Sequence, residues 1–475
     1  MENNAYLRTL LASFAAAGET TACALYDGET ATDISYRQLQ SDILHTAGWL
    51  QDAGIRGKHV AICAPNSYAW VVMCFGVLAA GNRALLLNPA LPGEMLREQC
   101  SRADAEYIWS SEALAPELAS LKTLSFEDCL KGSLLALQQV YVPEGDETVL
   151  LLGTSGTTGS SKIVEITTNN LCGCLDNLAE SSGKPGLERS LMGMPLFHIG
   201  GLVYGMIMLQ RLKVLCFGRG LRYLFGDMPV LNPTYIALVP SMLESLEKIM
   251  RRNPEPENRA KYLGTGLQRI FVGGASSRNS SCRYLMEQGF ALETGYGMTE
   301  TTGDGTWCEV DQAHVGTIGK PCGNLQWRIQ QGELQFKGPS IMKGYYRDPE
   351  ETARLIQDGW IATGDMGYCD ADGYLYLTGR KKNVIILPGG ENVNPEEVES
   401  RLLEGEGILE CLVYGDGRGL CAEVYTRDPE AAQKTIRSYN DAMPLFHQVY
   451  KVEYVSRPLE KTGTGKIKRK DSANV

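Results

Sequence analysis

The sequence has no hydrophobic run long enough to cross a membrane. The best apolar stretch, residues 69–80, stops at Gly81-Asn82-Arg83, whereas a membrane span needs about 20 apolar residues. We therefore expect a buried helix there. Near the start of the chain, Glu2 stands where a secretory signal has basic residues, so we expect mature protein without a signal peptide.

Cysteine and histidine patterns typical of metal sites or disulfide scaffolds are also absent. The 14 cysteines are scattered, the closest pair being Cys172 and Cys174, and no C-x-x-C occurs. The five histidines do not cluster with them. This spacing excludes zinc fingers and disulfide-rich domains. We expect free thiols and a cytoplasmic location.

An excess of basic residues is missing as well. Lys and Arg number 45 against 56 Asp and Glu, which gives a formal net charge of −11. This balance disfavours general binding to nucleic acids or anionic membranes. The 475 residues are 44% hydrophobic and 21% charged, as in ordinary soluble proteins, and are too many for one hydrophobic core.

Two common nucleotide-binding motifs fail on spacing. A Walker A loop needs Gly-Lys-Ser/Thr, but Ser160 and Ser161 precede Lys162, and residues 463–466 are followed by Ile467. A G-x-G-x-x-G pattern begins at residue 264 but has Arg269 at its third glycine position. P-loop NTPases and Rossmann dehydrogenases are therefore disfavoured.

The segment 152–162 is nevertheless rich in Gly, Ser and Thr, follows an apolar strand and ends in Lys162. Glycines let backbone N–H groups turn toward an anion, and hydroxyls and a lysine add further donors. Two interpretations remain open from the loop alone: a cradle for a triphosphate and a flexible connection.

Secondary-structure patterns predict a mixed α/β fold. Strand patterns at 59–62 and 84–87 flank a helical pattern at 67–80, which is typical of a βαβ unit. Further strand patterns continue at 149–152, 162–166, 213–217, 234–239, 269–272 and 290–293, with a helix at 241–251. They indicate large sheets covered by helices.

After about residue 330 the pattern changes to short strands with Gly and Asp-Gly turns, which predicts a β-rich subdomain. Past the charged segment 379–383, a small α+β domain is expected. Its first helix is signalled by Asn394 as N-cap, Pro395 in the first turn and Glu397 closing a capping box. We therefore expect a large N-terminal domain (1–380), a hinge (381–382) and a small mobile C-terminal domain (383–475).

Eight segments, in order along the chain, resemble the motifs of the adenylate-forming superfamily, in its acyl- and aryl-CoA synthetase branch. They are a phosphate loop (152–162), an acid-pocket segment (194–201), an adenine segment (272–275), a nucleotide and magnesium motif (294–300), a ribose motif (359–365), an interdomain joint (378–382), a following segment (389–397) and a terminal lysine motif (461–467). The resemblance implies an AMP-forming acid–thiol ligase. Such an enzyme joins a carboxylic acid to ATP, releases pyrophosphate, and passes the acyl group to a thiol.

The same resemblance implies the nucleotide ligands. ATP or AMP would be bound by Thr154, Ser155, Gly156, Thr157, Thr158, Gly159, Lys162, Gly273, Gly274, Ala275, Gly295, Tyr296, Gly297, Asp365 and Arg380. The loop hydroxyls and Lys162 would hold the β- and γ-phosphates, Tyr296 would stack on adenine, and Asp365 would accept from the ribose hydroxyls. Glu300 is the expected Mg²⁺ ligand, because a hard cation prefers carboxylate oxygen.

Catalytic roles are implied for Lys466, Thr299, Glu300 and His198. Lys466 would bridge the substrate carboxylate and the α-phosphate as charge redistributes. A lone histidine on an apolar segment more often lines a pocket than reacts, so pocket lining is the favoured role for His198. The acid pocket would be formed by His198, Gly200, Gly201, Gly273, Gly297 and Met298.

The small domain is implied to rotate about Lys382, replacing Lys466 at the site by Gly389 and Gly390, which would line the thiol tunnel. CoA is the expected acceptor, and the phosphopantetheine of a carrier protein is the alternative. The expected partners are thus ATP, a small carboxylic acid and this thiol, with no nucleic acid and an open oligomeric state.

Some residues depart from the family pattern. Ser161, Ile163 and Thr168 stand where members usually carry Pro, Gly and His, which leaves catalysis expected and its efficiency open. The pocket segment lacks the Asp that amino-acid-activating members use, so a neutral-tailed aliphatic or aromatic acid is favoured. Alternatives of other classes are an ATP-hydrolysing or kinase-type enzyme, a luciferase-like oxidase, and a non-catalytic nucleotide-binding module.

Overall fold

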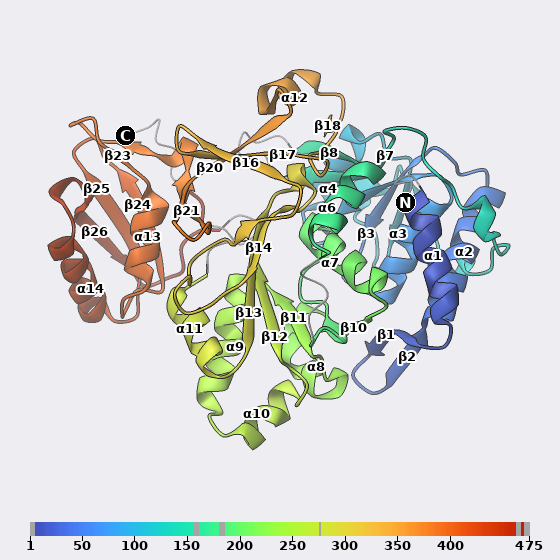
Figure 1. Cartoon of the computed structure of the whole chain (residues 1–475), viewed down its shortest axis with the longest axis horizontal. Coiled ribbons are helices and arrows are strands. Elements are labelled where there is room, and N and C mark those ends of the chain that lie inside the picture. The colour runs from blue at the N-terminus through green and yellow to red at the C-terminus, as the bar shows by residue number, and fades with distance from the viewer. Residues whose placement is uncertain (1–4, 155–160, 180–185, 275–276, 462–466, 470–475) are drawn as a thin grey trace.

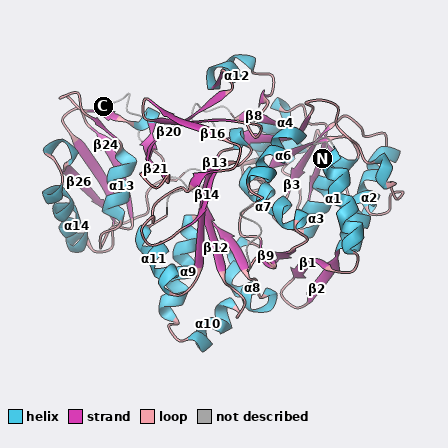
Figure 2. Ribbon diagram, viewed as in Figure 1, coloured by secondary structure: helices cyan, strands magenta, loops and turns pink. Residues whose placement is uncertain are grey.

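The computed structural model describes residues 5–154, 161–179, 186–274, 277–461 and 467–469 (Figure 1). Two large sheets with helices packed on them form most of the molecule, and a five-stranded sheet lies above the larger of them and beside the smaller in this view (Figure 2). A small C-terminal unit lies to one side, beside α11 and the five-stranded sheet and away from α1 and α2. The expected mixed α/β, multidomain fold is confirmed.

The largest sheet has nine strands in the order β15-β14-β13-β12-β11-β9-β10-β1-β2. The six adjacent strands β13, β12, β11, β9, β10 and β1 run parallel to one another, so their carboxyl ends lie at the same edge of the sheet. The strands are β1 (Thr21–Tyr26), β2 (Ala31–Ser35), β9 (Arg189–Leu191), β10 (Val214–Phe217), β11 (Tyr235–Leu238), β12 (Arg269–Gly273), β13 (Ala291–Gly297), β14 (Gly305–Glu309) and β15 (Lys320–Pro321).

The second sheet has seven strands in the order β18-β8-β7-β4-β3-β5-β6. The expected βαβ unit is present, because β3 and β4 are parallel and α3 (Tyr68–Ala79) connects them. In contrast, β7 and β8 form an antiparallel hairpin that pairs Thr154 with Lys162. The strands are β3 (His59–Cys63), β4 (Arg83–Leu87), β5 (Tyr107–Ser110), β6 (Lys122–Leu124), β7 (Thr148–Thr154), β8 (Lys162–Thr167) and β18 (Gly344–Tyr345).

One hydrophobic core joins the two large sheets. It contains apolar side chains of both sheets together with those of α1 (Tyr6–Ala17), α2 (Tyr36–Asp52), α3, α6 (Thr168–Asn177) and α7 (Ile199–Gln210). Helix α3 is apolar on all sides and almost fully buried, as the run at 69–80 predicted. Its N-terminus is capped by the Ser67 hydroxyl, which accepts from the Trp70 N–H at 3.1 Å.

The outer faces of the large sheets are covered separately. A second core lies between the nine-stranded sheet and the helices α8 (Leu224–Leu231), α9 (Pro240–Arg252), α10 (Pro256–Leu263) and α11 (Asn279–Glu287). A third covers the seven-stranded sheet with α4 (Gly93–Arg102). In the described part of the chain, no helix is long and apolar enough to cross a membrane, and all 14 cysteines are free thiols.

The β-rich region expected after residue 330 is present. It is built from β16 (Gln326–Gln330), β17 (Glu333–Lys337), β19 (Ile356–Gln357), β20 (Trp360–Cys369) and β21 (Leu375–Arg380). Helix α12 (Pro349–Leu355) connects β18 of the seven-stranded sheet to β19. The five-stranded sheet has its own small core around Phe336 and Ile361.

The C-terminal unit has a separate core. Its elements are β22 (Ile385–Ile386), β23 (Asn392–Val393), α13 (Pro395–Leu403), β24 (Glu410–Gly415), β25 (Leu420–Tyr425), α14 (Pro429–Ala442) and β26 (Val449–Val455). Pro395 opens α13 as predicted, but the predicted side-chain cap is wrong. The Asn394 amide instead donates to the Thr378 hydroxyl at 3.0 Å, and Glu397 pairs with Arg401. The Asn394 side chain is thus engaged by Thr378 and not by its own helix.

Candidate active site

Several of the residues singled out in the sequence lie together where the three sheets meet. Tyr296 lies at the end of β13, and Glu300 follows it in the short 3₁₀ helix η6 (Thr299–Thr301). Asp365 comes from β20 and Lys162 from the start of β8. Residues far apart in sequence therefore form one polar cluster at this junction.

Asp365 is the centre of the first half of the cluster. It is 6% exposed, and one carboxylate oxygen accepts from the Tyr296 hydroxyl at 2.5 Å. The other lies 2.8 Å from Nε of Arg380, which is its register partner across the β20–β21 pair. The carboxylate is thus held between a phenol and a guanidinium, and Tyr296 is tied to it through its hydroxyl.

Glu300 is the centre of the second half. Its side chain is buried, and Oε1 accepts from the Tyr345 hydroxyl at 2.9 Å. Burial raises the pKa of Glu300, while the Tyr345 hydrogen bond and the charges of Arg380 and Lys162 oppose that rise. These neighbours thus favour the ionised carboxylate against the effect of burial.

Lys162 is joined to Glu300 through Tyr345. Its ammonium group lies 5.1 Å from the centre of the Tyr345 ring, whose hydroxyl donates to Glu300. The ammonium also lies 2.5 Å from Oε1 of Glu351, in the first turn of α12. Sequence reasoning missed both Tyr345 and Glu351, since 189 positions separate Glu351 from Lys162 and no motif links them.

A buried carboxylate supports the loop that carries Glu300. Asp304 is fully buried and accepts from the Asn177 amide at 2.6 Å and from the Gly305 N–H at 2.8 Å. Burial raises the pKa of Asp304 to about 6. Asn177 belongs to α6, so this hydrogen bond fixes the loop to a helix of the shared core.

The glycines assigned to the acid pocket mostly allow close packing of their neighbours. A Cβ on Gly201 would lie 2.1 Å from the Pro195 carbonyl oxygen, and one on Gly297 would lie 2.3 Å from that of Gly303. A Cβ on Gly273 would meet the Phe271 ring at 2.7 Å, and one on Gly200 would meet Met194 at 3.1 Å. Among these and neighbouring positions, only Gly274, with φ of +84°, faces open space.

His198 precedes α7 at its N-cap position and makes no side-chain cap. The side chain is exposed, yet the protein mass around it lowers the pKa of His198 below its usual value through desolvation. This shift favours the neutral form of the imidazole over the charged form.

Asn66, which sequence reasoning missed, holds that segment in place. Its amide donates to the carbonyl oxygens of Met192 and Met194 at 3.1 and 2.8 Å, and its Oδ1 accepts from the Leu196 N–H at 2.7 Å. Asn66 follows β3, so the seven-stranded sheet fixes a segment that follows β9 of the other sheet. Its place just beyond a parallel strand was the available signal.

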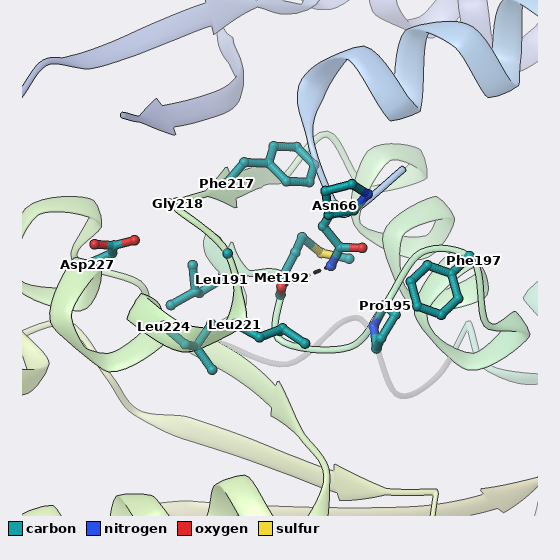
Figure 3. Close-up of a pocket in the computed structure, with 12 residues that line it drawn as sticks. Asn66, Leu191, Met192, Pro195, Phe197, Phe217, Gly218, Leu221, Leu224 and Asp227 are labelled. Carbon is teal, nitrogen blue, oxygen red and sulfur yellow. Dashed lines mark hydrogen bonds between the residues drawn. The ribbon is translucent and has the colours of Figure 1, made fainter. Parts of the chain in front are cut away.

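A pocket lies next to these contacts, and Figure 3 shows Asn66, Met192, Pro195 and Phe197 along one side of it. Its lining is mainly apolar and is completed by Pro65, Leu191, Phe217, Gly218, Gly220, Leu221, Leu224 and Asp227. The Asp227 carboxylate already pairs with Arg219, at 2.5 Å. The pocket thus offers carbon surface and no unpaired charge among its lining side chains.

The other predicted residues either lie outside the described part of the chain or stand elsewhere on it. Ser155, Gly156, Thr157, Thr158, Gly159, Ala275 and Lys466 lie outside the described residues. Gly389 and Gly390 are exposed on the turn between β22 and β23. Lys382 is exposed in η7 (Lys381–Asn383), which follows β21. Their tunnel and hinge roles remain predictions.

The described residues contain no group of three His, Cys, Asp or Glu side chains that would form a metal centre by themselves. Glu300 offers one hard oxygen donor. This fits Mg²⁺, which usually keeps waters and binds through one or two carboxylates and the phosphates of a substrate.

Comparison with known proteins identifies the family. A family model described as AMP-binding enzyme matches residues 13–346. The 2-succinylbenzoate–CoA ligase of Geobacillus sp. (strain WCH70) is 29% identical over 457 residues, which cover 91% of this chain and 88% of the relative. The long-chain-fatty-acid–CoA ligase of Bacillus subtilis (strain 168) is 28% identical over 519 residues, covering 92% and 89%.

Among solved structures, the O-succinylbenzoate coenzyme A synthetase of Bacillus subtilis, in complex with AMP, has the same fold. Its TM-score is 0.84 at 24% identity, with 98% of each chain covered. The superposition covers the large region and the C-terminal unit alike. The family match spans well over half of the sequence and includes the residues around Glu300, and the chain therefore belongs to the AMP-binding enzyme family.

Proposed function

We propose that this protein activates a carboxylic acid with Mg²⁺-ATP, releases pyrophosphate, and transfers the acyl group to CoA with release of AMP. One observation carries the proposal: Asp365 pairs with Arg380, the charges of Arg380 and Lys162 act on Glu300, and Lys162 lies over the Tyr345 ring whose hydroxyl donates to Glu300. Their order would suit the ribose, the Mg²⁺-binding phosphates and the terminal phosphates of one ATP molecule. The CoA-ligase relatives support the choice of acceptor.

Each described residue has a defined task in this reaction. Asp365 accepts from the ribose hydroxyls, and Arg380 keeps that carboxylate oriented. Glu300 binds Mg²⁺, which when bound neutralises phosphate charge and favours the departure of pyrophosphate. Lys162 binds the terminal phosphates. Positioning of two anions for in-line attack is the main demand of the reaction, so fixed cations and donors dominate it.

The acid is proposed to have a neutral, apolar tail. The pocket beside Phe197 has a carbon-rich lining, and none of its lining side chains supplies a cation for a second carboxylate. Burial of apolar tail surface there contributes about 25 cal/mol per Å². Aliphatic and aromatic monocarboxylic acids are therefore the first candidates.

The test is acid-dependent ATP–pyrophosphate exchange with Mg²⁺ and no thiol, over short, medium, long and aromatic monocarboxylic acids and a matched set of dicarboxylic acids. Exchange with monocarboxylic acids is the expected result. AMP formation should then require CoA and should not be supported by a carrier protein. ADP as product would instead establish a kinase or ATPase, and ATP binding without exchange would establish a non-catalytic module.

A further inference from the structure

Lys162 already has a carboxylate partner. Its ammonium group lies 2.5 Å from Oε1 of Glu351, and the two side chains are only 23% and 26% exposed. The pair holds the pKa of Glu351 below its usual value, so this carboxylate is charged at neutral pH. Half-buried pairs of this kind are screened less by solvent and salt than exposed ones.

Backbone pairing places Glu351 at this position. Strand β18 pairs with β8, and the Tyr346 N–H donates to the Ile163 carbonyl oxygen at 2.8 Å, next to Lys162. Helix α12 follows directly, and its N-terminus is capped by Asp348, whose carboxylate accepts from the Glu351 N–H at 3.1 Å. The first turn of α12 is thus held over the start of β8.

The hydroxyl of Thr352 reinforces this placement. It accepts from the Tyr345 N–H and donates to the Asp348 carbonyl oxygen, both at 2.8 Å. Arg354, one turn further along α12, lies 3.3 Å from the second oxygen of Glu351 and is itself largely exposed. Glu351 is therefore oriented by its own helix toward Lys162.

We propose that Glu351 is an internal counter-anion that competes with the terminal phosphates of ATP and pyrophosphate for Lys162. The proposal rests on the function proposed above, in which Lys162 binds those phosphates. Bound nucleotide has to draw the ammonium group away from Glu351 or accept a carboxylate beside its own negative charge. Either way polyphosphate is held less tightly, which favours release of pyrophosphate after the acid has been activated.

The decisive variant is Glu351→Gln, which keeps the shape of the side chain and removes its charge. Calorimetric titration with Mg²⁺-ATP and with Mg²⁺-pyrophosphate, without any acid, should show both dissociation constants falling about fivefold, as expected for loss of one half-buried charge. The affinity for AMP should not change, because AMP lacks the terminal phosphates.

Glu350→Gln is the matched control, because it removes the same charge from the neighbouring exposed position and should leave all three affinities unchanged. Glu351→Asp keeps the negative charge, so its affinities for ATP and pyrophosphate should lie closer to those of the wild type than those of Glu351→Gln do. In a Lys162→Met background, Glu351→Gln should have no further effect on ATP affinity.

Unchanged or weaker ATP binding by Glu351→Gln overturns the proposal, as does an equal gain from Glu350→Gln or for AMP. These titrations need no turnover, so the two proposals fail separately. Altered binding without acid-dependent exchange would refute the proposed ligase activity alone, and exchange without altered binding would refute the role of Glu351 alone.

Discussion

Replacing Tyr345 by Phe tests how Glu300 is kept ready for a metal ion. The substitution removes the hydroxyl that donates to Glu300 at 2.9 Å, and it keeps the ring beneath Lys162. A hydrogen bond to a charged group contributes about 1.5–3 kcal/mol. Even the lower figure corresponds to about one pKa unit at about 1.4 kcal/mol per unit.

The direction of the pKa change follows from which protonation form of Glu300 the Tyr345 hydroxyl stabilises. Tyr345 donates to the ionised carboxylate, so its loss raises further a pKa that burial has already raised. Protonated Glu300 does not bind Mg²⁺, so activity is lost as the pH falls through that pKa. The acidic limb of kcat/KM for Mg²⁺-ATP, which reports the free enzyme, should therefore move up by about one pH unit in Tyr345→Phe.

Tyr346→Phe is the matched control, because the Tyr346 hydroxyl donates to Asp104 and not to Glu300. Its acidic limb should coincide with that of the wild type. An acidic limb that stays in place in Tyr345→Phe, or moves to lower pH, would refute the coupling between this phenol and Glu300.

Three further substitutions test other parts of the site. Asp365→Asn should raise the KM for ATP about tenfold or more. The KM for 2′-deoxy-ATP should rise less, because this nucleotide already lacks one of the two ribose hydroxyls that would donate to Asp365. Glu404, at the end of α13 in the C-terminal unit, accepts from the backbone N–H groups of Asn279 and Ser280 in α11, at 2.6 and 3.2 Å. Because this contact joins the C-terminal unit to the large region, Glu404→Ala should slow adenylation severalfold while sparing thioester formation from supplied acyl-adenylate. Lys466→Ala should reduce adenylation about 100-fold or more and likewise spare the thioester step.

Each of these has an outcome that contradicts it. An equal loss with ATP and 2′-deoxy-ATP would remove the ribose role of Asp365. If Glu406→Ala, at a neighbouring exposed position, slows adenylation as much as Glu404→Ala, the contact with α11 does not matter. Equal loss of both half-reactions in Lys466→Ala would end the proposed division of work between the two steps.

The parts of the fold that were predictable are those determined by local sequence. The βαβ unit around α3 and the short strands after residue 330 were readable because their apolar period and turn residues lie within one window. The cap of α13 was not, since the amide of Asn394 found a partner at Thr378. The pattern rules for caps do not include a side chain that a distant residue engages through its donor group.

In the candidate site, too, the residues in local sequence motifs were predictable and those brought in by tertiary contacts were not. Glu300, Asp365 and Lys162 lie in continuous motifs and were found from them. Tyr345 and Glu351 complete the cluster through β18 and α12, which reach it only because β18 pairs with β8. The glycines assigned to the acid pocket make a related point: a sequence shows that a side chain is missing, and only the structure shows which neighbouring backbone or side chain fills the space.

The shared core between the two large sheets has a consequence for how the chain comes apart. Helices α6 and α7 contribute to it together with strands from both sheets, so neither sheet can lose its packing without exposing the other. The two should therefore exchange their amide hydrogens as one cooperative unit. The C-terminal unit, with its own core, should open at lower denaturant concentration, and a protease should release it as the first fragment.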